Sequence, residues 1–114
     1  EIDIWRENYG LYLGHDNPQY NISIDWLIKN ASYLWIHCKN DKALFYLNQF
    51  DELNIFFHRD DEFTISSKKQ ILINPSYSTF LRNGILMMPE LSKYNQEDIY
   101  KFDGIITDNI ISYK

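Results

Sequence analysis

The chain has 114 residues, close to the commonest size of a single domain, and 45% of them are hydrophobic. That share is too high for a disordered segment, so we expect one globular domain over residues 1–114. The net charge of −5 argues against a nucleic-acid partner. No apolar stretch reaches the roughly 18 residues of a membrane span, so no membrane partner is expected.

The single cysteine, Cys38, rules out a disulfide within the chain and is typical of a reducing compartment. Residues Glu1 to Arg6 lack the charged and apolar regions of a signal peptide. These two features predict a cytoplasmic protein.

The first third of the chain contains two overlapping patterns. Leu11 and Leu13 flank Tyr12 ahead of Gly14 and predict a short strand. Residues 20–26 then alternate as in a strand, whereas the apolar residues of 24–38 have helical spacing. Combining the two patterns, we predict a helix over residues 24–30 with Ser23 as its N-cap, followed by a strand over residues 33–38.

Residues 41–53 form a clearer helical pattern. Asn40 or Asp41 can accept the free N–H groups at its start. Tyr46 and Gln49 lie off the apolar stripe and should be more exposed. The stripe that should be buried comprises Ala43, Leu44, Leu47, Phe50 and Leu53.

The remainder of the chain predicts short elements separated by frequent turns. The first are a hairpin of Ile55–His58 with Glu62–Ser66, a strand Gln70–Ile73 and a helical turn Tyr77–Leu81. An apolar run Ile85–Met88 follows. The last are a helix Gln96–Phe102, capped by Asn95 and ended by Gly104, and an edge strand over Ile105–Tyr113. Because strands and helices are segregated along the chain, we predict an α+β fold with a mostly antiparallel sheet of about four to six strands and two or three helices.

The residues that could carry chemistry form no recognisable motif. His58, Asp60 and Glu62 could bind a metal but are expected on a solvated hairpin tip. His37 and Cys38 are neighbours on a strand, so their side chains should point to opposite faces, with Cys38 buried and inert. His15–Asp16 is typical of an ordinary turn. We therefore assign no catalytic residue, no metal and no cofactor.

Charge is the one uneven property of the chain. Six acids and two bases give residues 41–62 a charge of −4, with aromatic residues interleaved among them. An acidic surface with aromatic anchors suits a basic protein partner. The predicted partner-binding residues are Asp51, Glu52, Asp60, Asp61 and Glu62, with Tyr46, Phe56 or Phe57 exposed among them.

Three functional hypotheses follow. The leading one is a non-enzymatic immunity-type inhibitor that occludes the active site of a basic, nuclease-like bacterial toxin, by analogy with small acidic domains of this class. The alternative is a small hydrolase or nuclease that uses His15, His37 or His58 with nearby carboxylates. The third is an adaptor domain of a larger protein.

Overall fold

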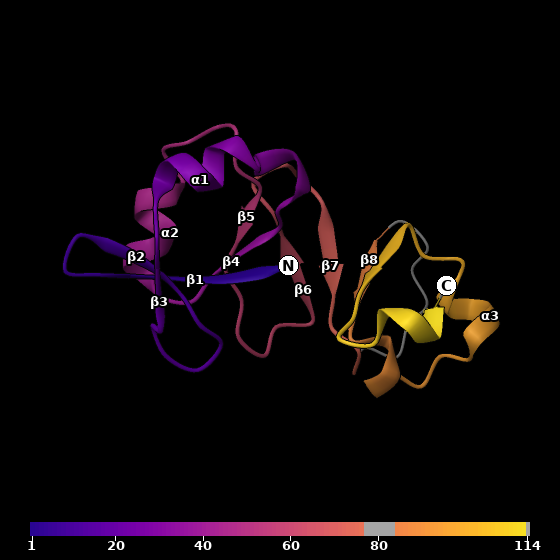
Figure 1. Ribbon diagram of the computed structural model, residues 1–114. Helices are drawn as coiled ribbons and strands as arrows, with labels where there is room; N and C mark the ends of the chain where they lie inside the picture. Colours follow the sequence, from indigo (N-terminus) through magenta and orange to yellow (C-terminus); the bar gives the residue numbers. More distant parts are fainter. Residues whose placement is uncertain (77–83, 114) are drawn as a thin grey trace. The chain divides into compact units, whose positions relative to one another are not determined.

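The computed structural model describes residues 1–76 and 84–113 and has an α+β architecture. The chain divides into two compact units, each with its own sheet (Figure 1). Unit 1 comprises Glu1–His58 and Ser66–Lys68, and unit 2 comprises Arg59–Ile65 and Lys69–Lys114. The single domain expected from chain length stays a prediction.

The sheet of unit 1 has five strands in the order β3-β2-β1-β4-β5. Their bounds are β1 Ile2–Glu7, β2 Gly10–Leu13, β3 Tyr20–Ile22, β4 Ile36–Cys38 and β5 Ile55–Phe56. The pairs β1–β2 and β2–β3 are antiparallel, whereas β1–β4 and β4–β5 are parallel. The parallel pairs arise because helices connect these strands, namely α1 (Ile24–Lys29) before β4 and α2 (Asp41–Leu47) between β4 and β5.

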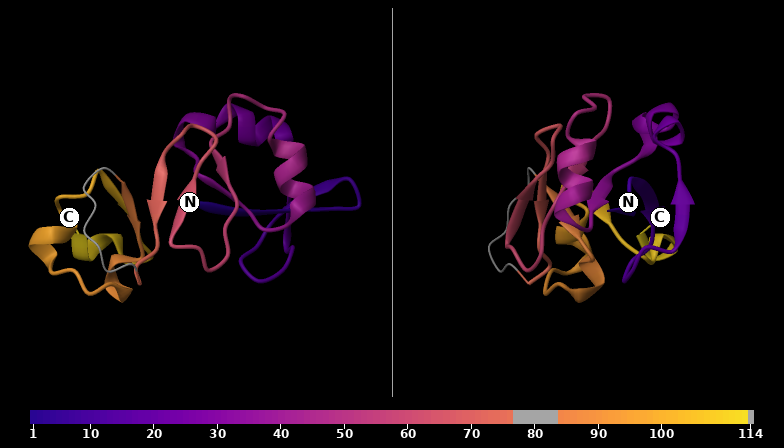
Figure 2. Two further views of the ribbon diagram at one scale, coloured as in Figure 1. Left: turned by 180° about the vertical axis from the view of Figure 1, so that it is seen from behind. Right: turned by 90° about the vertical axis from the view of Figure 1, so that its left-hand side faces the viewer.

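One face of this sheet carries the core of unit 1. Ile4 of β1 and Cys38 of β4 are completely buried, together with Leu27 of α1 and with Ala43 and Leu47 of α2. Helix α2 packs on β1, β4 and β5 (Figures 1 and 2). Because side chains alternate along a strand, the residues between the core positions point to the other face.

Helix α2 starts as predicted and ends earlier. The Asn40 side chain accepts a hydrogen bond from the Ala43 N–H at 3.0 Å and caps the helix, which ends at Leu47. Leu47 is buried and Gln49 is exposed as predicted, but Leu44 and Phe50, which were expected to be buried, are only half-buried. The expected exposure of Tyr46 is wrong, because the Arg6 guanidinium lies 3.6 Å above its ring and half-buries it.

The sheet of unit 2 has four strands in the order β6-β7-β8-β9. Their bounds are β6 Phe63–Ile65, β7 Ile71–Ile73, β8 Ile85–Met87 and β9 Gly104–Ile106. Only β6–β7 is antiparallel. Helix α3 (Gln96–Ile99), capped by Asn95, lies between β8 and β9 in the chain. Ile73, Leu86, Ile99 and Phe102 form the core of this unit.

The prediction of a mostly antiparallel sheet is therefore wrong, since both sheets are mixed. The predicted hairpin of Ile55–His58 with Glu62–Ser66 is also wrong. Strand β5 pairs in parallel with β4, and β6 pairs with β7. Ile55 is instead hydrogen-bonded to Ser67, which follows β6. The Ser67 N–H donates to the Ile55 carbonyl at 2.7 Å, and the Ser67 hydroxyl accepts from the Ile55 N–H at 2.8 Å.

Several local predictions are confirmed. They are the helix after Ser23 and the strand at Leu11–Leu13. Three further elements exist but are shorter than predicted: the strand ending at Cys38 starts at Ile36, the next predicted strand is Ile71–Ile73, and the helix capped by Asn95 ends at Ile99. Gly104 begins β9, and after this edge strand the chain forms a 3₁₀ helix at Ile110–Tyr113. The predicted turn at Tyr77–Leu81 lies outside the described residues. Strand β1, which pairs with both β2 and β4, was not predicted.

Within residues 1–76 and 84–113, no helix combines the length and the apolar character needed to cross a bilayer.

Candidate functional site: a histidine and carboxylate cluster

Four polar side chains of unit 1, those of Glu1, Asp3, His37 and His58, form a cluster at the sheet face opposite the buried core of this unit. Strand register pairs Asp3 of β1 with His37 of β4, and His37 with Phe56 of β5. Glu1 immediately precedes β1, and His58 follows β5 after one intervening residue. Residues distant in sequence are thus brought together by the parallel pairing of three strands.

The two imidazole rings stack on each other. The ring centroids of His37 and His58 are 4.4 Å apart, and the ring planes differ by 11°. The Phe56 ring lies 5.2 Å from His37 and 5.7 Å from His58, nearly parallel to both. Phe56 is only 2% exposed, so it forms an apolar support that restricts how both imidazoles can rotate.

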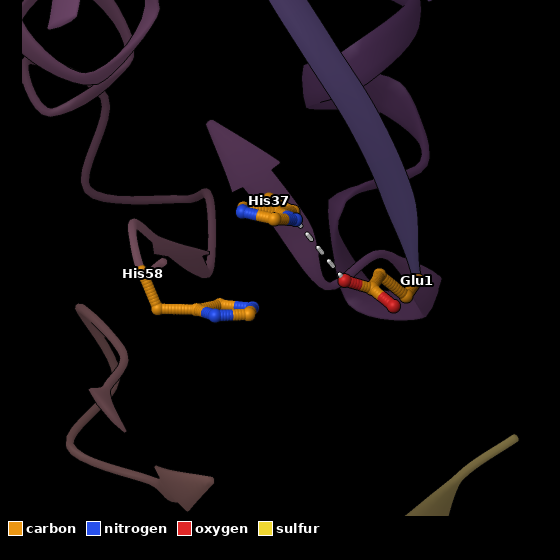
Figure 3. A group of neighbouring side chains, drawn as sticks. All are labelled: Glu1, His37 and His58. Atoms are coloured by element: carbon orange, nitrogen blue, oxygen red, sulfur yellow. Dashed lines mark ion pairs between the residues drawn. The ribbon is translucent and has the colours of Figure 1, made fainter. Parts of the chain in front are cut away.

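Two carboxylates face the same nitrogen of His37. Its Nδ1 lies 3.2 Å from Asp3 Oδ1 and 3.6 Å from Glu1 Oε2. Figure 3 shows Glu1 beside the edge of the His37 ring, with the His58 ring below it. The His37 side chain is 12% exposed and that of Glu1 is 27% exposed, so the cluster is half-buried with its more open side at Glu1.

The environment separates the pKa values of the two carboxyl groups. Burial, together with the negative charge of Asp3, raises the pKa of Glu1, and the charge of His37 opposes this only partly. Burial also acts to raise the pKa of Asp3, but its hydrogen bond with His37 and the nearby positive charges outweigh burial and lower it. Asp3 is therefore the stronger acid of the pair.

The cluster has a composition suited to a cation. Glu1, His37 and His58 each offer a ligand atom, and these atoms all lie within 4.8 Å of one another. Two imidazoles and one carboxylate are a ligand set typical of zinc and related transition metals.

Cys38 lies on the opposite face of the same strand and takes no part in the cluster. It is completely buried, and burial raises the pKa of its thiol to about 12. The prediction that Cys38 is buried, and that His37 cannot act on it, is confirmed by this placement.

His15 is not part of the stacked pair. It is exposed and pairs with its neighbour Asp16, with Nδ1 and Oδ1 2.8 Å apart. Of the three histidines proposed from the sequence, the structure brings together His37 and His58. Glu1 and Asp3 were missed, although Asp3 stands between two isoleucines in an alternating pattern that predicts a strand.

The acidic residues predicted from charge are all exposed. Asp51 and Glu52 belong to unit 1, and Asp60, Asp61 and Glu62 belong to unit 2, so their common face stays a prediction. The expectation of an exposed aromatic anchor among Tyr46, Phe56 and Phe57 is wrong. Phe56 is buried beside the imidazoles, and the other two are half-buried. Phe45 is the aromatic residue of α2 that lies in solvent, with 75% exposure.

A shallow cavity of about 270 Å³ lies elsewhere in unit 1. Phe50, Leu53 and Ser67 contribute to its lining. Lys68 closes one side by donating a hydrogen bond from Nζ to the Asp51 carbonyl at 2.7 Å. The cavity does not include the imidazole pair, so the two features are separate.

Comparisons of the chain with protein-family models, curated proteins and solved structures found no match.

Proposed function

We propose that this chain is a small hydrolase whose centre is the cluster of Glu1, Asp3, His37 and His58. The observation that carries the proposal is the stacking of two imidazoles at 4.4 Å beside two carboxylates on one sheet face. Imidazole is the side chain best suited to transfer protons near neutral pH. Two imidazoles, one of them in contact with a carboxylate, can supply both a general acid and a general base.

In this proposal the two imidazoles act in sequence on a bound ester or amide. One ring nitrogen accepts a proton from the attacking water as its oxygen bonds to the carbonyl carbon. The other ring donates a proton to the leaving group as the bond to the carbon breaks. Asp3 orients His37 through the 3.2 Å contact at Nδ1.

Charge favours neutral or cationic substrates. The cluster contains two acidic side chains, and the whole chain carries a charge of −5. A polyanion such as a nucleic acid would be repelled unless a bound cation offset this charge. We therefore expect carboxylic esters or amides to be better substrates than phosphodiesters.

The test measures hydrolysis of a chromogenic carboxylic ester, a phosphomonoester and a phosphodiester. We expect His37→Ala and His58→Ala each to lower kcat/KM for the ester at least about a hundredfold. His15→Ala is the matched control, because it removes an exposed imidazole outside the stacked pair. Equal activity in all three variants would mean that the hydrolysis is background reactivity of imidazole and would exclude the proposal.

A second candidate function is the immunity-type inhibitor of a basic toxin. It is supported by the exposure of Asp51, Glu52, Asp60, Asp61 and Glu62, and by the exposed Phe45 in the same acidic segment. Charge would steer the encounter, and an aromatic side chain would hold the complex.

Titration against basic nuclease domains tests this second proposal, starting with any toxin encoded beside the gene. Asp60→Lys with Asp61→Lys should slow association at least about tenfold at low salt without unfolding the chain. Asp108→Lys, an exposed reversal outside the acidic segment, is the control. Equal effects of the two changes, or no binding to the adjacent toxin, would contradict the inhibitor hypothesis.

A further inference from the structure

We propose that Glu1, His37 and His58 form a site for a single divalent transition-metal ion of the zinc type. This inference rests on the cluster of the proposed hydrolase and changes the source of its nucleophile: in the metal-loaded chain the ion would activate the water, and the ring nitrogens that bind it would carry no proton. Its geometric basis is independent of catalysis: the three ligand atoms lie within 4.8 Å of one another, and all three residues belong to unit 1.

A tetrahedral ion requires one imidazole ring to turn out of the present stack, because the in-plane lone pairs of two parallel rings cannot meet at one point. Bonds of 2.0–2.2 Å in a tetrahedral site place neighbouring ligand atoms about 3.4 Å apart. The 3.6 Å between His37 Nδ1 and Glu1 Oε2 already matches this separation. The ligand that has to turn is His58, which lies after the end of β5 and is half-buried.

The ligand types select the class of ion. Calcium and magnesium prefer shells made of oxygen atoms, whereas this site offers two imidazole nitrogens. Two histidines and one glutamate, with a fourth position open to water, are the ligand set of many catalytic zinc sites. The open side at Glu1 leaves room for that water.

The sheet holds one of the ligands in place. His37 lies within β4, between β1 and β5. Asp3 also faces His37 Nδ1, at 3.2 Å. When an ion replaces the proton on this nitrogen, Asp3 lies within about 5 Å of it, close enough to accept a hydrogen bond from a metal-bound water.

A bound cation would also offset the negative charge of the two carboxylates in the cluster. Glu1 and Asp3 both face His37 Nδ1, at 3.6 and 3.2 Å, so two negative charges lie close together in the cluster. A divalent ion would neutralise both carboxylates. Without an ion, the same histidines and carboxylates form ion pairs and hydrogen bonds among themselves, and a metal titration distinguishes this network from a metal site.

The test titrates the metal-free chain with Zn²⁺ by calorimetry and with Co²⁺ by visible absorption. We expect saturation at one ion per chain and, for Co²⁺, the intense ligand-field bands of a tetrahedral site. His37→Ala, His58→Ala and Glu1→Gln should each weaken Zn²⁺ binding at least about tenfold. His15→Ala should leave both binding and spectrum unchanged. Circular dichroism of each variant checks that it remains folded.

A second control tests whether the α-amino group of Glu1, and not its side chain, binds the ion. The same titrations are repeated on a chain carrying additional residues before Glu1, so that no free α-amine lies at this position. Retained Zn²⁺ affinity supports the proposed ligand set. Loss of binding in this extended chain, with Glu1→Gln having no effect, would assign the ion to the amine and overturn the inference.

Failure of the metal site and failure of the hydrolase give different results. Stoichiometric binding with no hydrolysis of any substrate supports the site and excludes the proposed function. Hydrolysis that is lost in His37→Ala but unaffected by a chelator, in a chain with no saturable Zn²⁺ binding, supports the function and overturns the metal site.

Discussion

The two faces of the unit 1 sheet are built from the same strands but differ in composition. On the helix-covered face, Ile4 and Cys38 are fully buried with Leu47. On the other face, Asp3, His37 and Phe56 lie side by side, with His58 stacked against them. Since neighbouring residues on a strand point to opposite faces, one face can hold the fold together while the other carries the histidines and carboxylates. Disrupting each face separately tests this division.

Leu47→Ala should produce the largest loss of stability, about 2–5 kcal/mol, because it opens a cavity in the core of the helix-covered face. Urea denaturation followed by circular dichroism measures the change in the free energy of unfolding. Phe45→Ala, on the same helix but 75% exposed, is the matched control and should cost less than about 0.5 kcal/mol. Equal effects would mean that α2 does not pack as described.

Cys38 should react with a thiol reagent at least about a hundredfold more slowly in the native protein than in denaturant. The thiolate is the reactive form, and burial, which raises the pKa of Cys38 to about 12, suppresses it as well as blocking access. Absorbance of the released chromophore at pH 8 gives both rates. Rapid labelling of the native chain would place this thiol outside the core.

Asn40→Ala should destabilise the protein by about 2 kcal/mol, near the upper end for an N-cap. Its side chain caps α2, accepts from the Arg6 N–H at 3.2 Å and donates to the Arg6 carbonyl at 3.0 Å, so it also ties the helix to β1. Ser23→Ala removes a single capping bond, to Trp26, and should cost about 1 kcal/mol. Thermal and urea melts of the two variants should rank them in this order.

His37→Ala should have a small effect on stability, about 1 kcal/mol, the value of an aromatic stack, since it removes no aliphatic core group. Denaturation in the presence of a chelator measures this loss of unfolding free energy in the metal-free protein. Adding Zn²⁺ should then raise the melting temperature of the parent chain but not that of the variant. A cost comparable to that of Leu47→Ala would mean that the polar face is itself part of the core.

Local chemistry in the sequence was sufficient to predict the helix starts. Ser23, Asn40 and Asn95 each cap a helix as expected, because a cap depends on residues only three positions apart. The burial of Leu47 and Cys38 also followed from local apolar pattern and residue type. These features need no knowledge of strand order.

Tertiary structure decided the strand partners and therefore the cluster. Ile55–Phe56 and Phe63–Ile65 looked like the arms of one hairpin, yet each pairs with a different strand. Strand pairing depends on contacts between residues far apart in the chain, which periodicity cannot specify. Asp3, His37 and His58 are separated by more than 50 positions in total, and only the parallel pairing of β1, β4 and β5 brings them side by side.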